Sequence, residues 1–163
     1  MSTNETTLHL VCGKIAAGKS TLVTELGSRS STVIVREDRW LSRLYPGEQS
    51  TLDDYVRNSA RLRNAISAHL VDLLRNGLSV VLDFPANTPN SRAWMRTLFE
   101  DARCAHQLHY LDVPDQVCKA RLKRRNESGE HEFIVSDEEF DLITTYFVPP
   151  SMDEDFKVVV HRP

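Results

Sequence analysis

One stretch of the chain has the residue types and the spacing that bind a phosphate chain. Gly13-Lys14-Ile15-Ala16-Ala17-Gly18-Lys19-Ser20 fits the pattern G-x-x-x-x-G-K-[ST], and Thr21 follows it. Two glycines allow a loop tight enough for successive backbone N–H groups to point at a polyphosphate. The pattern predicts that Lys19 reaches the β- and γ-phosphates and that the Ser20 hydroxyl ligates Mg²⁺. We therefore predict that residues 13–21 bind the phosphates of a nucleoside triphosphate.

The segments on either side of this loop provide the strand and the helix that it requires. Thr7–Cys12 is a short apolar run typical of a buried strand, and Leu22, Val23 and Leu26 follow the loop at helical spacing. A helix that begins near Gly18 points the positive end of its dipole at a bound anion. This context favours a nucleotide site over an incidental glycine-rich turn.

Acidic residues follow the next two apolar runs. Thr32–Val35 predicts a second buried strand, after which Glu37 and Asp38 come, and Leu78–Leu82 predicts a third, which ends at Asp83. In an open α/β sheet, ligands bind at the carboxyl ends of the strands. An acid in that position can orient Mg²⁺ through its water shell, so we assign this role to Asp83. The alternative for Asp83 is a turn-forming aspartate before Phe-Pro.

Basic and amide side chains near the expected cleft are candidates for binding the substrate. Arg57 and Arg61 share one face of a long helix that begins at Thr51, and they could line a substrate groove. A solvated helix face explains these two arginines equally well. Asn87 and Arg92 lie near the start of the following helix, close to the same cleft, and we assign them to the substrate side.

A later basic helix has the features of a lid. After an apolar strand over Leu108–Val113, Arg121 and Arg125 lie four residues apart and so on one helix face. The polar segment Asn126–Glu130 predicts a flexible loop. A lid over about residues 119–135 would close over the phosphates, and its two arginines would stabilise charge on the transferring group. The alternative is a basic helix that is simply solvated.

The alternation of strand and helix continues to a fifth strand over Phe156–Val160. It predicts a single α/β domain over residues 1–163, with three layers, a five-stranded and mainly parallel sheet, helices on both faces and a small helical lid. His106 and His109 lie three apart on or beside a strand, so their side chains face opposite ways. No second pair of ligands completes a zinc site with them.

Composition and charge restrict the partners. Of the 163 residues, 40% are hydrophobic and 26% are charged, as in an ordinary soluble domain, and the net charge of −3 gives no generally basic surface for extended nucleic acid. The polar N-terminus is no signal peptide, and no apolar run has the length of a membrane span. The three cysteines lack paired spacing. We expect a cytoplasmic protein with no membrane partner, and the oligomeric state stays open.

With those residues placed, the chain resembles the small P-loop kinases related to polynucleotide kinase, chloramphenicol phosphotransferase and zeta toxins, and the broader adenylate-kinase-like fold. The phosphate loop carries the resemblance together with Arg36-Glu37-Asp38, Val80–Asp83, and the spaced Arg121 and Arg125. Asp83-Phe84-Pro85 is similar to the Asp-Gly-Phe-Pro of adenylate kinases, without the glycine. We expect no phosphatase domain beside the kinase segment.

The resemblance implies that an acid at the end of the second strand receives the proton of the acceptor hydroxyl. The register allows Glu37 or Asp38 in this role. We assign Asp38 as the base, because a shorter carboxylate holds its geometry more firmly, and place Glu37 on the substrate side.

The resulting hypothesis is an ATP-dependent kinase, with ATP and Mg²⁺ as its cofactors, that transfers the γ-phosphate to a hydroxyl of a small molecule or nucleotide. Lys19, Asp38, Arg121 and Arg125 form its catalytic set. Three alternatives stay open: a P-loop ATPase or switch that is not a kinase, a toxin-type kinase of a sugar nucleotide, and a nucleotide-binding module without turnover. No residue in the sequence identifies the acceptor.

Overall fold

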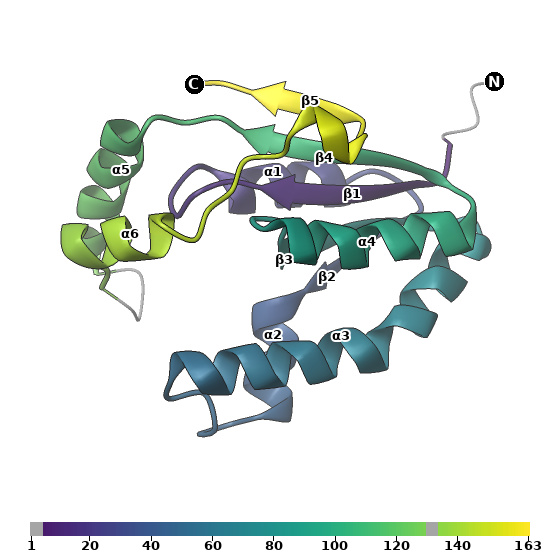
Figure 1. Cartoon of the computed structure of the whole chain (residues 1–163), viewed down its shortest axis with the longest axis horizontal. Coiled ribbons are helices and arrows are strands. Elements are labelled where there is room, and N and C mark those ends of the chain that lie inside the picture. The colour runs from purple at the N-terminus through teal and green to yellow at the C-terminus, as the bar shows by residue number, and fades with distance from the viewer. Residues whose placement is uncertain (1–4, 130–133) are drawn as a thin grey trace.

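The computed structural model describes residues 5–129 and 134–163, which form a parallel five-stranded sheet with helices on both faces (Figure 1). The strand order is β2-β3-β1-β4-β5, and every neighbouring pair is parallel. The strands are β1 (Thr7–Cys12), β2 (Thr32–Arg36), β3 (Ser79–Pro85), β4 (Ala105–Leu111) and β5 (Val158–His161). The predicted fold class is therefore confirmed, with a sheet that is wholly parallel.

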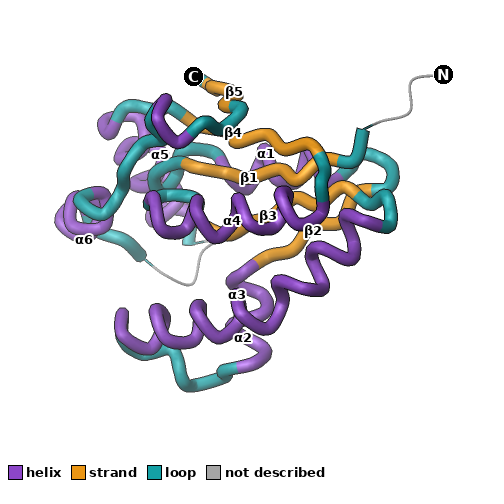
Figure 2. The backbone as a smooth tube through the Cα atoms, turned by 45° about the vertical axis from the view of Figure 1, so that its right-hand side comes forward, coloured by secondary structure: helices purple, strands orange, loops and turns teal. Residues whose placement is uncertain are grey.

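The helices form layers on the two faces of the sheet and a cluster at one end of it. They are α1 (Lys19–Gly27), α2 (Glu37–Leu44), α3 (Leu52–Arg75), α4 (Pro89–Ala102), α5 (Asp115–Ser128) and α6 (Asp137–Thr144), with a short 3₁₀ turn at Met152–Glu154. In Figures 1 and 2, α3 and α4 lie over one face, α1 lies behind the sheet, and α5 and α6 lie beyond its end. No helix in the described part of the chain is both long and apolar enough to cross a membrane.

Local sequence signals account for most helix ends. Thr51 and Ser136 begin α3 and α6 as capping boxes, and Thr88 caps α4, which has proline in its first turn. The predicted loop over Asn126–Glu130 is wrong at its start, because α5 continues to Ser128. Its residues favour helix until Gly129, which takes a left-handed conformation at the C-terminus of the helix. Residues 130–133 of the predicted lid lie outside the described residues.

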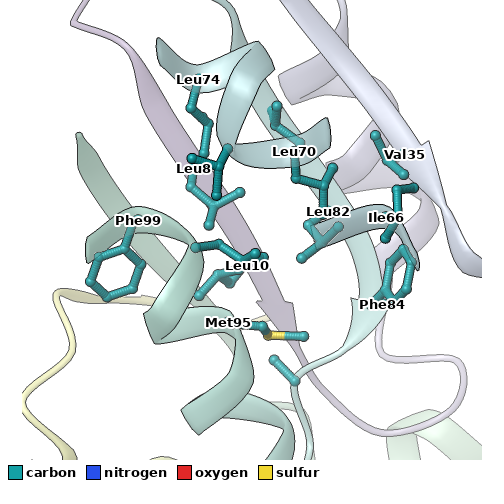
Figure 3. Close-up of a cluster of buried hydrophobic side chains, with 14 of the residues drawn as sticks. Leu8, Leu10, Val35, Ile66, Leu70, Leu74, Leu82, Phe84, Met95 and Phe99 are labelled. Atoms are coloured by element: carbon teal, nitrogen blue, oxygen red, sulfur yellow. The ribbon is translucent and has the colours of Figure 1, made fainter. Parts of the chain in front are cut away.

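The core holds the phosphate-binding end of the sheet in place from both faces. On one face, Leu10 and Leu82 pack against α3 and α4 through Ile66, Leu70 and Met95 (Figure 3). On the other face, Val11 and Val81 contact Val23 and Leu26 of α1. A third cluster joins the loop to α5 and α6 and contains Ala17, Leu111, Leu122 and Phe140. Burial of these side chains, at about 1.5–3 kcal/mol each, anchors the loop and the helices that surround it.

Candidate active site

The phosphate loop joins the carboxyl end of β1 to the N-terminus of α1. Its two glycines are required for different physical reasons. Gly18 caps α1 with a φ of +103°, a conformation that L-residues with side chains rarely adopt. A Cβ at Gly13 would lie 3.2 Å from the Cβ of Leu111 and 3.3 Å from that of Ala17. Gly18 is therefore required by its backbone conformation, and Gly13 is required by the lack of space for a side chain.

The Lys19 ammonium closes the loop from inside. Its Nζ donates to the carbonyl oxygens of Gly13, at 2.5 Å, and Lys14, at 2.8 Å. Burial lowers the pKa of Lys19, and the positive charge of Arg125 lowers it further, whereas the charge of Asp83 raises it. Arg125 and Asp83 therefore both lie close enough to Lys19 for their charges to act on it.

Arg121 and Arg125 lie on α5 beside the loop, one helical turn apart. Arg121 donates to the carbonyl oxygens of Ala16, at 3.4 Å, and Ala17, at 3.2 Å. The Nε of Arg125 is buried and has no hydrogen-bond partner among the described residues. A guanidinium with a buried donor left unpaired is suited to an incoming anion.

Asn87 braces the first residue of the loop. Its side-chain amide accepts from the N–H of Gly13, at 3.0 Å, and donates to the Gly13 carbonyl, at 3.1 Å. The Asn87 carbonyl in turn accepts from the N–H of Val148, at 2.9 Å. The sequence predicts Asn87 as a substrate contact, and the structure places both ends of its amide on the loop backbone instead.

Asp83 and Asp38 lie at the carboxyl ends of neighbouring strands. Asp83 stands directly across from Arg36 in the pairing of β3 with β2, and Arg36 Nη1 lies 3.4 Å from its carboxylate. Burial raises the pKa of Asp83, the charge of Arg36 opposes this, and the nearby Asp38 and Lys19 pull it in opposite directions. Asp38 and Lys19 therefore both lie close enough to Asp83 for their charges to act on it, at the carboxyl edge of the sheet.

Glu37 is buried and engaged, unlike its neighbour in sequence. It is 2% exposed, and its two oxygens accept from Tyr55 Oη, at 2.5 Å, and Ser59 Oγ, at 2.8 Å. Burial raises the pKa of Glu37, and these two donors oppose that shift. Asp38 lies exposed in the first turn of α2. Glu37 therefore anchors α2 to α3 and leaves Asp38 facing solvent.

The other predicted substrate residues lie away from this group. Arg57 is half-exposed and pairs with Asp54 at 2.9 Å, and Arg61 is exposed on α3. Arg92 is fully buried and forms two hydrogen bonds to the Glu154 carboxylate, at 2.7 and 3.1 Å. It also donates to the backbone carbonyls of Ala86 and Val148. Arg92 therefore fastens the C-terminal segment to α4.

Sequence reasoning missed Arg63, which lies two residues beyond Arg61 on α3. Arg63 Nη1 donates to Ser91 Oγ at 3.1 Å, and its guanidinium lies over the ring of Trp94, 4.9 Å from the centroid. Arg63 also lies 3.9 Å from Glu37. The available signal was the spacing of four that links Tyr55, Ser59 and Arg63, which puts three polar side chains on one helix face.

Two hollows flank the loop and the acids. One, of about 800 Å³, runs along α2 beside Asp38 and is also lined by Arg39, Ser42, Arg43 and Tyr45. The other, of about 440 Å³, lies beside the first turn of α1 and is lined by Gly18, Thr21, Leu22, Leu111, Arg121 and His161. Because Thr21 follows the phosphate loop directly, this second hollow continues the path of a phosphate chain bound there.

The parallel sheet, the phosphate loop between β1 and α1, and acids at the ends of β2 and β3 define a P-loop kinase fold. The chain belongs to the AAA_33 family, described as "AAA domain", whose model matches residues 8–150. A comparison with curated proteins finds no match.

Solved structures that share this fold include kinases of several kinds. A gluconokinase from Sinorhizobium meliloti is 15% identical, with a TM-score of 0.61 over 99% of this chain and 84% of that one. A sugar kinase from Janibacter is 14% identical, with a TM-score of 0.65 over 96% and 85%. A chain of the Pnkp1/Rnl/Hen1 RNA repair complex is 17% identical, with a TM-score of 0.67 over 89% of this chain and 45% of that one. The present chain thus spans less than half of that last protein.

Proposed function

We propose that this protein is an ATP-dependent kinase that transfers the γ-phosphate to a hydroxyl group of a small molecule or nucleotide. The observation that supports the proposal is that the charges of Lys19 and Asp38 both act on Asp83, while Arg121 of α5 bonds to the phosphate loop. A phosphoryl transition state needs positioned positive charge around the phosphate and a carboxylate for the acceptor proton. The phosphate loop and the ends of β2 and β3 provide both the positive charge and the carboxylates.

The donor binds along residues 13–20. Its phosphate oxygens accept from loop N–H groups, and the Lys19 ammonium leaves the carbonyls of Gly13 and Lys14 to reach the terminal phosphates. Arg121 and Arg125 neutralise charge as the γ-phosphoryl group transfers. The nucleoside enters the hollow lined by Thr21 and Leu111, where apolar side chains can pack against a base and charged side chains also lie.

The oxygen ligands near the loop fit Mg²⁺. Ser20 lies exposed in the first turn of α1, and the half-buried Asp83 carboxylate faces the same cleft as Lys19. A hydroxyl and a carboxylate, completed by water and phosphate oxygens, are ligands that Mg²⁺ prefers. When bound, the ion neutralises part of the phosphate charge. Ser20 and Asp83 would hold it.

Asp38 is the base for the acceptor hydroxyl, and the hollow beside it holds the acceptor. Arg39 and Arg43 line this hollow one turn apart on α2, and neither forms an ion pair within the described ranges. Two unpaired guanidinium groups favour an acceptor that carries a phosphate or carboxylate near its hydroxyl. The acceptor class is therefore an anionic alcohol.

The test is a screen of hydroxyl acceptors with γ-labelled ATP, Mg²⁺ and the whole chain. Phosphorylated and carboxylated alcohols should be labelled in preference to their neutral counterparts, and Lys19→Ala should remove all labelling. Release of labelled phosphate without any labelled acceptor would point to an ATPase. Binding of ATP without turnover, with water or any acceptor, would point to a binding module.

A further inference from the structure

Three histidines form a continuous hydrogen-bonded chain across neighbouring strands. His9 of β1 bonds through Nδ1 to Nε2 of His109 of β4, at 3.0 Å. His109 bonds through Nδ1 to Nε2 of His161 of β5, at 2.9 Å. Both pairs have ring centroids 5.2 Å apart and planes tilted by 33°. The second step of the chain repeats the first.

The two buried histidines of this chain, His9 and His109, are neutral at neutral pH. His9 and His109 are 4% and 3% exposed, and burial lowers the pKa of each to about 4, helped by the positive charge of Arg29. The third histidine, His161, is half-buried and ends the chain. A neutral imidazole carries one N–H, so each link requires a donor on one ring and a bare nitrogen on the next.

When all three rings are neutral, only two arrangements of protons satisfy both links. Either all three rings carry the proton on Nε2, or all three carry it on Nδ1. In the first arrangement His161 Nδ1 is a bare acceptor, and in the second it is an N–H donor. The change from the first to the second takes up one proton at His161 Nδ1, passes one along each link, and releases one from His9 Nε2 to water.

His161 is the end of the chain that meets the nucleotide site. It lines the hollow beside Gly18 and Thr21, between the apolar walls of Leu22 and Leu111. Its Nδ1 makes no hydrogen bond to the described part of the chain, whereas its Nε2 is held by His109. The hollow is also lined by the charged side chains of Glu25, Arg121 and Arg162, so a flat ring would pack against the apolar walls with polar groups around its edge.

We propose, on the basis of the proposed function, that His161 is a specificity residue for the base of the donor. In the Nε2–H arrangement, His161 Nδ1 accepts from the exocyclic amino group of adenine. In the Nδ1–H arrangement, the same atom donates to the exocyclic oxygen of guanine. The buried His9–His109 pair can supply either arrangement, so the site accepts both purine nucleotides.

The direct test measures the proton positions in the whole protein labelled with ¹⁵N-histidine. Nuclear magnetic resonance distinguishes Nδ1–H from Nε2–H rings in the free protein and with AMPPNP, GMPPNP or tripolyphosphate. We expect all three rings to carry Nε2–H with AMPPNP and Nδ1–H with GMPPNP, and tripolyphosphate to leave them as in the free protein. The same proton position on His161 in both nucleotide complexes would overturn the proposal.

Binding measurements separate this proposal from the proposed function. His161→Leu should weaken AMPPNP and GMPPNP by about tenfold each and leave tripolyphosphate unchanged, because only a contact to the base is lost. His161→Gln, which can both donate and accept, should recover most of the affinity. Unchanged nucleotide affinity in His161→Leu would refute the contact between His161 and the base, and it would leave the proposed kinase function standing. Failure of tripolyphosphate to bind the wild-type protein would refute the phosphate site, and this proposal with it.

Discussion

The donor and acceptor sides of the cleft differ in how far their polar groups are already paired. On the donor side, Lys19, Asn87 and Arg121 all bond to carbonyl oxygens of the phosphate loop. Lys14 extends this network to α5 through Asp115, at 2.6 Å. The loop therefore keeps its shape before a ligand arrives, which favours binding because little ordering remains.

On the acceptor side, charged groups are exposed instead. Three charged residues of α2 are exposed: Asp38, Arg39 and Arg43. The one buried charged residue of this helix is Glu37, whose hydrogen bonds hold α2 against α3. Pairing of those exposed groups is left to the ligand. Under the proposed function, this difference would mean that one half binds a fixed phosphate chain and that the other sets specificity through the surface of α2.

Loss of the Lys19 ammonium should have the largest effect on catalysis. Lys19→Ala removes the positive charge that meets the terminal phosphates, and we expect transfer to fall by about 10³-fold or more. Thermal unfolding should change far less than transfer, because the lost contacts are two hydrogen bonds within one loop. The control is Lys123→Ala, which removes an exposed lysine from α5. Equal losses in both variants would mean that the donor side is not organised around Lys19.

Exchange of the two neighbouring acids tests the acceptor side. Asp38→Asn should lower transfer by about 10²–10⁴-fold while nucleotide affinity is kept, because only the proton acceptor is lost. Glu37→Gln should instead lower the free energy of unfolding by about 1–3 kcal/mol, since Tyr55 and Ser59 lose a charged partner. Transfer assays and urea unfolding on both variants make the comparison. Should Glu37→Gln abolish transfer in a stable protein, the base would be Glu37.

The brace between α4 and the C-terminal segment should affect stability before catalysis. Arg92→Leu leaves the Glu154 carboxylate and two backbone carbonyls without their donor, and we expect a loss of about 3 kcal/mol in unfolding free energy. The matched control is Asp141→Asn, which breaks an exposed pair with Lys119 at 2.9 Å and should cost less than about 1 kcal/mol. A similar loss in both variants would show that burial of the Arg92 pair contributes nothing extra.

The fold could be predicted from the sequence because its signals are local. Apolar runs mark the strands, Thr51, Thr88 and Ser136 mark the helix starts, and the glycine spacing marks the loop. The end of α5 could not be predicted from polarity, because residues that suit a solvated loop also suit a solvated helix. Only Gly129 carried a stop signal there.

The site was predictable where a residue is fixed by its own segment. Lys19 and Asp83 follow from the loop pattern and from the end of a strand. Glu37, Asn87 and Arg92 each have a partner 18 to 74 residues away in Tyr55, Gly13 and Glu154, so their roles depend on tertiary packing. The spacing of arginines on α3 was ambiguous for the same reason. Arg57 and Arg61 share a helix face, yet it is Arg63 that lies near Glu37.

The last prediction concerns the chain of three histidines, and it tests whether His9 and His109 are neutral in the folded protein. His9 and His109 have pKa values of about 4 in the folded protein, below the value of 6.5 expected when unfolded, so between these values the unfolded chain binds more protons. Stability should therefore fall as pH decreases through this window, by about 1–2 kcal/mol per histidine between about pH 7.5 and about pH 5. Arg29 and His161 are the charged or titratable neighbours that act on the pair. Urea unfolding across pH should show a shallower slope in His109→Leu and an unchanged slope in His69→Gln, an exposed histidine on α3. An unchanged slope in His109→Leu would mean that the chain is not neutral, and the two proton arrangements that require neutrality would not exist.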